Sequence, residues 1–172
     1  MQALRILVKR GHAAKSREIK LLQGYEKMKL NAETIRGIKD SHVEWLATDG
    51  RFGRRADFRY ADLSETIELY CADLSFALMT GANLTRCYLI GVNFTGAILA
   101  DVCFKEANLC SADMSHSIMT RANLASAFIE NVDVKGADMF CCNLYNTDKS
   151  KVKNWFLARN TTACIYDECK KY

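Results

Sequence analysis

The stretch GANLTRCYLIGVNFTGAILADVCFKEANL, residues 81–109, has a large apolar residue at every fifth position. The residue two places before each of these is small. A period of five fits neither the 3.6-residue turn of an α-helix nor the two-residue alternation of a β-strand. The stretch therefore predicts a repeated unit of five residues with one large residue in each. The large residues are Leu84, Leu89, Phe94, Leu99, Phe104 and Leu109.

The period continues far beyond this stretch. It runs from Leu74 to Leu144 through fifteen successive large apolar residues, which we call the centres. The residue two places before a centre is never large, and the residue directly before it is often Asp or Asn. A fixed period over much of a chain indicates a repeat protein in which each unit packs on its neighbours.

One irregularity interrupts the upstream part of the repeat. Residues 56–58 and 61–63 keep the pattern, but the next step, from Leu63 to Leu69, is six residues long. We interpret this as one inserted residue near Thr66, after which residues 67–69 resume the register. About eighteen repeats result, and they span residues 56–144.

The pattern A-(D/N)-L-x-x resembles that of the pentapeptide-repeat family. The resemblance implies an all-β solenoid, a right-handed quadrilateral β-helix in which four pentapeptides make one square coil. The centre of each side then points to the axis, the small residue two places earlier faces inward near a corner, and the other positions face water. Coils stack about 4.8 Å apart, as neighbouring strands do.

Stacking assigns residues twenty apart to one column. Phe94 and Phe104 lie two sides apart in one coil, so we expect their rings to meet across the axis. Cys87 and Cys142 occupy inward small-residue positions, whereas Cys103, Cys110 and Cys141 occupy outward ones.

The flanks are expected to cap the repeat. We divide the chain into a basic N-terminal segment with a capping helix (1–50), the β-helix (51–148) and a basic C-terminal cap (149–172). Residues 1–30 fit either helix or strand. From Asn31, a plausible N-cap, the pattern predicts a helix that ends before Gly50. Its apolar face contains Ile35, Ile38, His42, Trp45 and Leu46.

The stretch HVEWLATDGRFGRRADF, residues 42–58, resembles the junction between helix and repeat in bacterial and phage members of the family. After Asp148, a second short helix is expected, with Val152, Trp155 and Phe156 on one side. The resemblance adds an alternative to capping alone, because related C-terminal caps also form a dimer interface. Trp155 and Phe156 are the candidates for both roles.

No catalytic or metal-binding motif is present. The sequence lacks a catalytic serine motif, a phosphate-binding glycine loop and a paired cysteine pattern for zinc, and its three histidines are far apart. Its eight cysteines, without a secretory signal, predict free thiols in a reducing cytoplasm. No segment is long enough to span a membrane. We therefore expect a cytoplasmic protein that is not an enzyme and carries no cofactor or metal.

Charge is distributed unevenly along the chain. Residues 1–55 hold 13 Lys and Arg against 6 Asp and Glu, a net +7. Residues 56–148 hold 5 against 12, a net −7, and residues 149–172 hold 6 against 2, a net +4. An acidic repeat between basic flanks favours a binding function.

Two functions fit this distribution. In the first, the acidic shaft imitates DNA, which carries about one charge per 1.7 Å of its axis. By resemblance to family members that protect DNA gyrase, the partner would be gyrase or another DNA-processing enzyme. The candidate outward acids are Asp73, Asp101, Glu106, Asp113, Glu130, Asp133 and Asp138.

In the second, the shaft is a rigid spacer whose basic flanks bind a nucleic acid, an acidic protein or an anionic membrane surface. Residues of this basic patch include Lys9, Arg10, Lys15, Arg17, Arg54 and Arg55.

Overall fold

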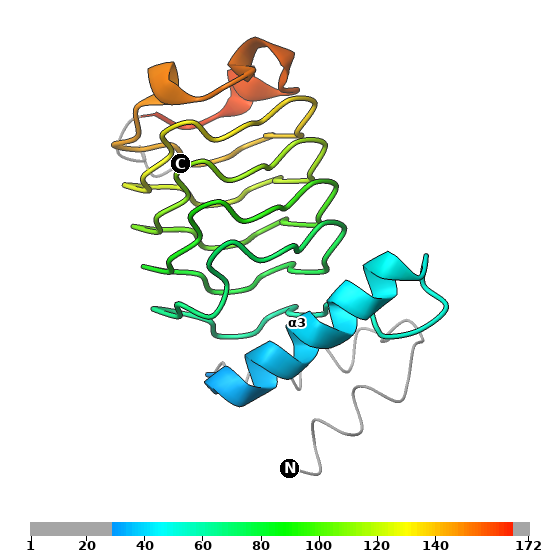
Figure 1. Ribbon diagram of the computed structural model, residues 1–172. Helices are drawn as coiled ribbons and strands as arrows, with labels where there is room; N and C mark the ends of the chain where they lie inside the picture. The colour runs from blue at the N-terminus through cyan, green and yellow to red at the C-terminus, as the bar shows by residue number, and fades with distance from the viewer. Residues whose placement is uncertain (1–28, 167–172) are drawn as a thin grey trace, which may run out of the picture.

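The computed structural model describes residues 29–166, which form one helix and a stack of square coils. Helix α3 (Ala32–Ala47) crosses one end of the stack, and three short 3-10 helices lie at the other end (Figure 1). These are η1 (Lys149–Lys151), η2 (Trp155–Leu157) and η3 (Thr161–Ala163). Four residues of the predicted basic patch lie outside the described residues: Lys9, Arg10, Lys15 and Arg17.

Parallel pairing between successive coils holds the stack together. Asn93 pairs with Asp113, and Asp113 with Asp133, at intervals of twenty residues. Phe94 N donates to Asp113 O at 2.6 Å, and Asp113 N donates to Val92 O at 2.9 Å. The same pattern recurs on all four sides, with isolated bridges rather than extended strands among the described residues. The four-sided coil that the family resemblance implied is confirmed.

We number the sides of the square by their inward columns. Side 1 has Leu74, Phe94, Met114 and Val134; side 2 has Phe58, Met79, Leu99, Met119 and Met139; side 3 has Leu63, Leu84, Phe104, Leu124 and Leu144; side 4 has Leu69, Leu89, Leu109 and Ile129.

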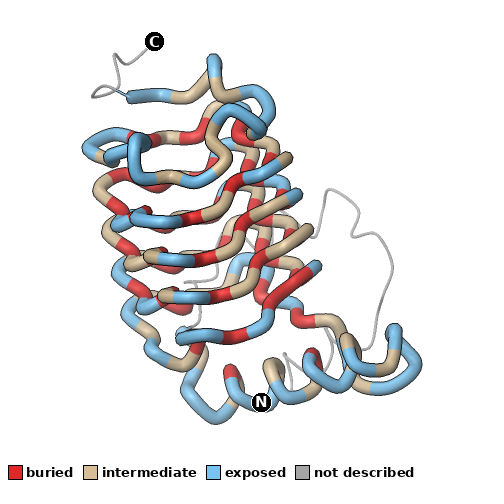
Figure 2. The backbone as a smooth tube through the Cα atoms, turned by 45° about the horizontal axis from the view of Figure 1, so that its top comes forward, coloured by how far each residue is buried: buried red, intermediate tan, exposed pale blue. Residues whose placement is uncertain are grey.

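The core lies along the axis of the coils. All fifteen centres from Leu74 to Leu144 are buried, as is every residue two places before them. Figure 2 shows these positions as red bands that recur at the same places in successive coils. The rings of Phe94 and Phe104 meet edge to face, with centroids 6.1 Å apart. The predicted inward register and the predicted ring contact are both confirmed.

The corners adopt a backbone conformation that the period alone does not reveal. The residue two places after each centre has a positive φ throughout the coils, from Tyr60 (60°) to Asn146 (55°). Glycine adopts this left-handed conformation readily, and other residues do so at a cost. Most corners nevertheless carry other residues, including Arg86 (57°) and Asp101 (59°). Glycines at positions 81, 91, 96 and 136 are the sequence signal for these corners.

The insertion is placed by the pairing intervals. Asp62 pairs with Asn83, 21 residues on, whereas Asp73 pairs with Asn93, 20 residues on. Thr66 O accepts from Tyr88 N at 3.1 Å, as the small inward residue does in the other coils, so the extra residue follows Thr66. The prediction that residues 67–69 resume the register is wrong for Ile67, which bulges outward and is 64% exposed. It holds for Leu69, which is buried.

Helix α3 begins where the sequence predicts. The side chain of Asn31 accepts a hydrogen bond from Thr34 N at 2.8 Å and thereby caps the helix. Ile35 and His42 are its buried residues, and Ile35 belongs to the apolar core at the end of the coils. The apolar face read from the sequence is therefore the face that packs against the first coil.

The predicted helix after Asp148 is wrong. The chain instead pairs with the preceding coil, Lys153 with Asp133, Arg159 with Asp138 and Ile165 with Asn143. This pairing provides acceptors for backbone N–H groups of the previous coil, which an α-helix could not provide because its own carbonyls are paired.

The side chains of this last coil also differ from the prediction. Val152 and Trp155 pack against the core, but Phe156 is 83% exposed. The three residues therefore do not share one packing face. The chain turns at Asn154 and Asn160 with positive φ, as it does at the regular corners.

Candidate functional site

The outer surface of the coils is built from the residues that flank each centre. Where Asp or Asn precedes a centre, its side-chain oxygen accepts from the backbone N–H two residues later. Ser75 N donates to Asp73 at 3.0 Å, Ser115 N to Asp113 at 2.8 Å and Thr85 N to Asn83 at 3.2 Å. This local bond stabilises the turn and explains why either Asp or Asn can occupy the position. Only Asp adds charge.

The seven candidate acids do not lie together. Asp73, Asp113 and Asp133 share one column on side 1, separated only by Asn93. Glu130 lies on side 4, next to the corner that joins it to side 1. The other three are Asp101 at the corner of sides 2 and 3, Glu106 at the corner of sides 3 and 4, and Asp138 on side 2.

Arginines neutralise two of the three scattered acids. Arg121 donates to both oxygens of Asp101, at 2.7 and 2.6 Å, and Arg86 donates to Glu106 at 2.8 Å. These hydrogen bonds are the largest cause that lowers the pKa of Asp101 and of Glu106. We therefore expect neither carboxylate to be a free phosphate surrogate.

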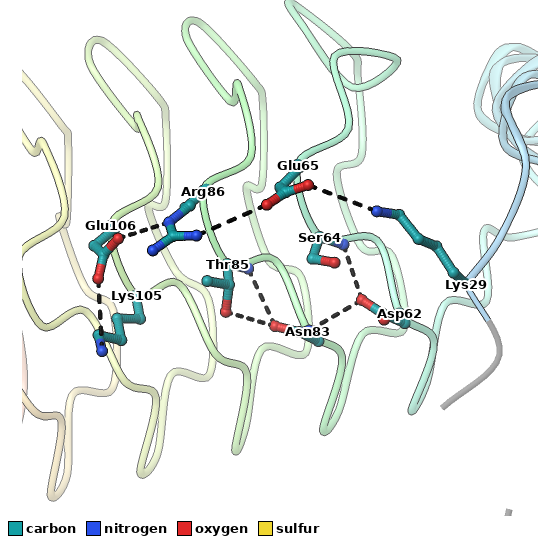
Figure 3. A network of polar contacts seen from close by, with 9 residues as sticks. All are labelled: Lys29, Asp62, Ser64, Glu65, Asn83, Thr85, Arg86, Lys105 and Glu106. Carbon is teal, nitrogen blue, oxygen red and sulfur yellow. Dashed lines mark hydrogen bonds and ion pairs between the residues drawn. The ribbon is translucent and has the colours of Figure 1, made fainter. Parts of the chain in front are cut away.

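Figure 3 shows a line of alternating charges along the corner of sides 3 and 4. Arg86 lies 2.8 Å from Glu106 and 3.8 Å from Glu65, which in turn lies 3.8 Å from Lys29. Beside this line, the side-chain amide of Asn83 donates a hydrogen bond to the Asp62 carboxylate at 3.0 Å. The sequence signal for the two ion pairs of Arg86 is opposite charge at an interval of 20 or 21 residues, which the sequence analysis did not use.

A second kind of corner contact has the same interval. A Cβ atom on Gly81 would lie 2.6 Å from the Tyr60 ring, and one on Gly96 would lie 2.7 Å from the Phe76 ring. The rings of Tyr60 and Phe76 therefore lie along the corner against the next coil, where glycine leaves room for them.

The corner between sides 4 and 1 differs from the others, because it carries only small or short polar residues. These are Cys71, Gly91, Ser111 and Asn131. Four candidate acids border it and form what we call the acidic edge: Asp73, Asp113, Glu130 and Asp133. Within residues 29–166 none of the four is in an ion pair. Asp133 instead accepts from the Asn154 amide at 2.9 Å.

Side 4 also carries four of the five most exposed large apolar residues between residues 56 and 148; the fifth is Tyr60. We call Ile67, Tyr70, Tyr88 and Phe128 the aromatic strip; each is between 53% and 64% exposed. Beside Phe128 an open groove of about 570 Å³ is lined by charges of both signs, including Arg86, Glu130 and Lys151. Exposed apolar groups gathered on one side are typical of protein-binding surfaces. Sequence reasoning missed the strip because it concentrated on the acids.

The basic residues are divided between the two ends. Arg55 donates to Phe76 O and is partly buried, which lowers its pKa. At the other end, the Lys149 ammonium lies 4.4 Å from the Tyr166 ring centroid and 5.9 Å from that of Trp155. Both cations thus hold the fold as well as charging the surface.

Two kinds of feature are absent from the described part of the chain. No helix between residues 29 and 166 has the length and hydrophobicity that crossing a bilayer requires. In the same residues, no three side chains of His, Cys, Asp or Glu converge as metal ligands would.

Comparison with known proteins identifies relatives of the repeat. Residues 67–105, 103–139 and 117–148 match the family described as pentapeptide repeats, in eight copies. No curated protein matches the sequence.

Among solved structures, alr5209, a pentapeptide repeat protein from Nostoc PCC 7120, is 23% identical with a TM-score of 0.53. The match covers 83% of this chain and 100% of that one. Rfr23, a pentapeptide repeat protein from the cyanobacterium Cyanothece 51142, is 24% identical with a TM-score of 0.42, over 69% of each chain.

QnrB1, a plasmid-mediated fluoroquinolone resistance protein, is 15% identical with a TM-score of 0.32, over 70% of this chain and 68% of that one. At 23% identity, the similarity to alr5209 concerns the fold alone.

Proposed function

This chain belongs to the pentapeptide-repeat family, and on that basis we propose that it is a non-enzymatic interaction protein. Its acidic edge would take the place of DNA phosphates in the basic groove of a DNA-processing enzyme. A type II topoisomerase such as DNA gyrase is the partner to test first. The observation that carries the proposal is the column of Asp73, Asp113 and Asp133 beside Glu130, without a cation on any of them among the described residues.

The geometry of the edge supports this role. Asp113 and Asp133 are in adjacent coils and so lie about 5 Å apart along the axis, while Asp73 and Asp113 are two coils, or about 10 Å, apart. The carboxylates therefore follow a straight line on a rigid rod. A line of fixed charges steers a basic groove into one orientation and accelerates association.

The proposed binding surface contains four of the seven acids named from the sequence. Asp101 and Glu106 are excluded from the edge because Arg121 and Arg86 hold them. Asp138 lies on side 2, and the Asn160 amide donates to it at 2.8 Å.

A supercoiling assay with purified gyrase tests the proposal. We expect the wild type to inhibit or protect the enzyme, with an effect that weakens as salt is raised. The variant Asp73→Asn/Asp113→Asn/Asp133→Asn should lose most of the effect, because it removes three negative charges from the edge. Asn forms the same local bond at this position, so the fold should be retained.

A matched control removes the same number of negative charges from positions outside the acidic edge. Asp101→Asn/Glu106→Gln/Asp138→Asn also removes three carboxylates and should act like the wild type. If the wild type neither inhibits nor protects the enzyme, or if the two triple variants behave alike, the acidic edge is not a DNA substitute for this target.

A second function is favoured by the last coil, which has four cations and no acid in residues 149–166. On this alternative the shaft is a spacer that presents a basic end to nucleic acid, an acidic protein or an anionic membrane. Retardation of duplex DNA in a gel by the wild type, lost in a variant with Lys151 and Lys153 changed to Gln, would favour it over mimicry.

Self-association through the C-terminal coil is also part of the proposal. Phe156 is 83% exposed, whereas Trp155 packs against the core, so Phe156 is the residue available to a second copy. A dimer that Phe156→Ser dissociates in sedimentation equilibrium would support this contact.

A further inference from the structure

The aromatic strip and the acidic edge border the same corner of the β-helix. Going along the chain, Tyr70 is followed by Cys71 at the corner and then by Asp73. Three coils further along the stack, Glu130 is followed by Asn131 at the corner and then by Asp133. Apolar groups on side 4 therefore lie within a few residues of the carboxylates on side 1.

Nothing bulky separates the two surfaces. The side chains at this corner are the short ones of Cys71, Gly91, Ser111 and Asn131, whereas other corners carry tyrosine, phenylalanine, histidine and arginine. A partner can therefore contact both sides of the corner at once.

We infer that the strip and the edge form one two-sided binding surface, whose partner is a protein with apolar side chains directly beside its basic groove. This inference rests on the proposed function and adds a requirement to it. The acids would guide association, and the aromatic strip would hold the complex together. Buried Tyr and Phe side chains are frequent energetic centres of protein interfaces, whereas charge complementarity acts more on encounter and specificity.

The charge beside the strip argues against a second copy as its occupant. A symmetric dimer through side 4 would bring together two shafts that each carry −7 over residues 56–148, with an acidic edge at both borders of the contact. Opposite charge is needed there. A basic partner supplies it, and the same face of a second copy does not.

The test compares two double variants that each remove one exposed Tyr and one exposed Phe. Tyr88→Ser/Phe128→Ser removes two of the three aromatic residues of the strip on side 4, which lie two coils apart with Asn108 between them. Tyr60→Ser/Phe140→Ser, the control, changes two exposed aromatics that belong to side 2 and its corner. Both doubles, the Asp73→Asn/Asp113→Asn/Asp133→Asn variant and the wild type are bound to immobilised gyrase over a series of salt concentrations. Circular dichroism and thermal melting check that each is folded.

We expect the strip variant to bind at least about tenfold more weakly through faster dissociation, with the salt dependence unchanged. The triple Asn variant should show the reverse: a weaker salt dependence and a slower association. The control double variant should bind like the wild type.

The possible failures can be told apart. If the wild type binds through the acids but the strip variant equals the control, the two-sided surface is wrong and the proposed function stands. If the strip variant binds weakly but the triple Asn variant equals the wild type, both proposals are wrong, because the acids then contribute nothing. If the wild type does not bind gyrase at all, both are overturned for this target.

Discussion

His42 illustrates how much a single side chain can do at the junction between helix and coils. It is fully buried, and its ring stacks on Trp45 with centroids 5.6 Å apart. Ala56 N donates to Nδ1 at 3.1 Å, and Nε2 lies 3.0 Å from Ser75 O. Nδ1 therefore accepts and Nε2 donates, which requires the neutral ring. Burial is the largest cause that lowers the pKa of His42.

A pH dependence of stability follows. Because the folded pKa is below the ordinary 6.5, the unfolded chain binds the proton first as the pH falls. We expect the free energy of unfolding to decrease as the pH falls below about 6.5, by about 1.4 kcal/mol per unit of pKa difference, and to level off below the folded pKa. Urea unfolding at a series of pH values measures this.

The variant His42→Gln serves as the control for that series. It should be less stable at neutral pH but should lose the decrease that begins near pH 6.5. Parallel curves for the wild type and the variant would contradict the assignment to His42.

Gly96 tests the contact along a corner. Its φ is +64°, and a Cβ atom would lie 2.7 Å from the Phe76 ring. We expect Gly96→Ala to destabilise the protein by about 1–3 kcal/mol, from left-handed backbone strain and the forced movement of the ring. Thermal unfolding of Gly96→Ala, Phe76→Ala and the double variant measures the coupling. The double variant should regain part of the loss; strict additivity would mean that the two residues do not touch.

At the scale of elements, the regular coils and helix α3 could be predicted from the sequence, but the irregular C-terminal coil was not. The inward columns follow from volume at every fifth residue, and helix α3 follows from its cap and apolar face. The C-terminal coil was mistaken for a helix because its spacing is irregular, with pairing intervals of 20, 21 and 22 residues. Lys153 and Arg159 occupy the positions that Asp or Asn occupies in other coils, so the residue pattern did not indicate a further coil.

The last coil should protect the stack from association. Met139 N donates to Arg159 O at 3.0 Å and Leu144 N to Ile165 O at 2.7 Å. Removing residues 149–172 would leave these donors on an open edge, which is a template for pairing with another chain. We expect this truncation to form oligomers in light scattering, whereas removal of residues 167–172 alone should not. A truncated chain that stays monomeric with unchanged melting would contradict the role of the coil.

At the scale of the whole molecule, the outward columns were predicted from the sequence but the contacts within them were not. Stacking at twenty residues correctly put Asp73, Asp113 and Asp133 in line. The pairing of Asp101 with Arg121 depends on corner side chains that lean along the axis, and this direction is set by the positive φ rather than by the period. The aromatic strip also depends on the outward bulge at Ile67, which a count of spacings cannot locate to one residue.

Removing one whole coil should leave a shorter protein of the same fold. Deletion of residues 97–116 joins Gly96 to Ser117, which keeps every column in register because twenty residues are lost. We expect this chain to fold with a lower melting temperature, since it has fewer stacked coils. Deletion of residues 97–115 loses nineteen and leaves one extra residue at the junction, which has to bulge outward as Ile67 does, so we expect this chain to melt at a lower temperature than the twenty-residue deletion. Circular dichroism distinguishes the two, and similar melting of both would contradict a register of twenty.

Because all corners share the left-handed backbone conformation, the fold requires the backbone turn but tolerates different side chains at it. The backbone turns in the same way at Arg86, Ser111 and Asn146, so the turn does not depend on which side chain is there. Outward residues can therefore be exchanged coil by coil, provided that they suit the neighbour about twenty residues away and that the local bond of the Asp or Asn before a centre is kept. Such a rod can acquire a new specificity by local substitution, without a compensating change in its interior.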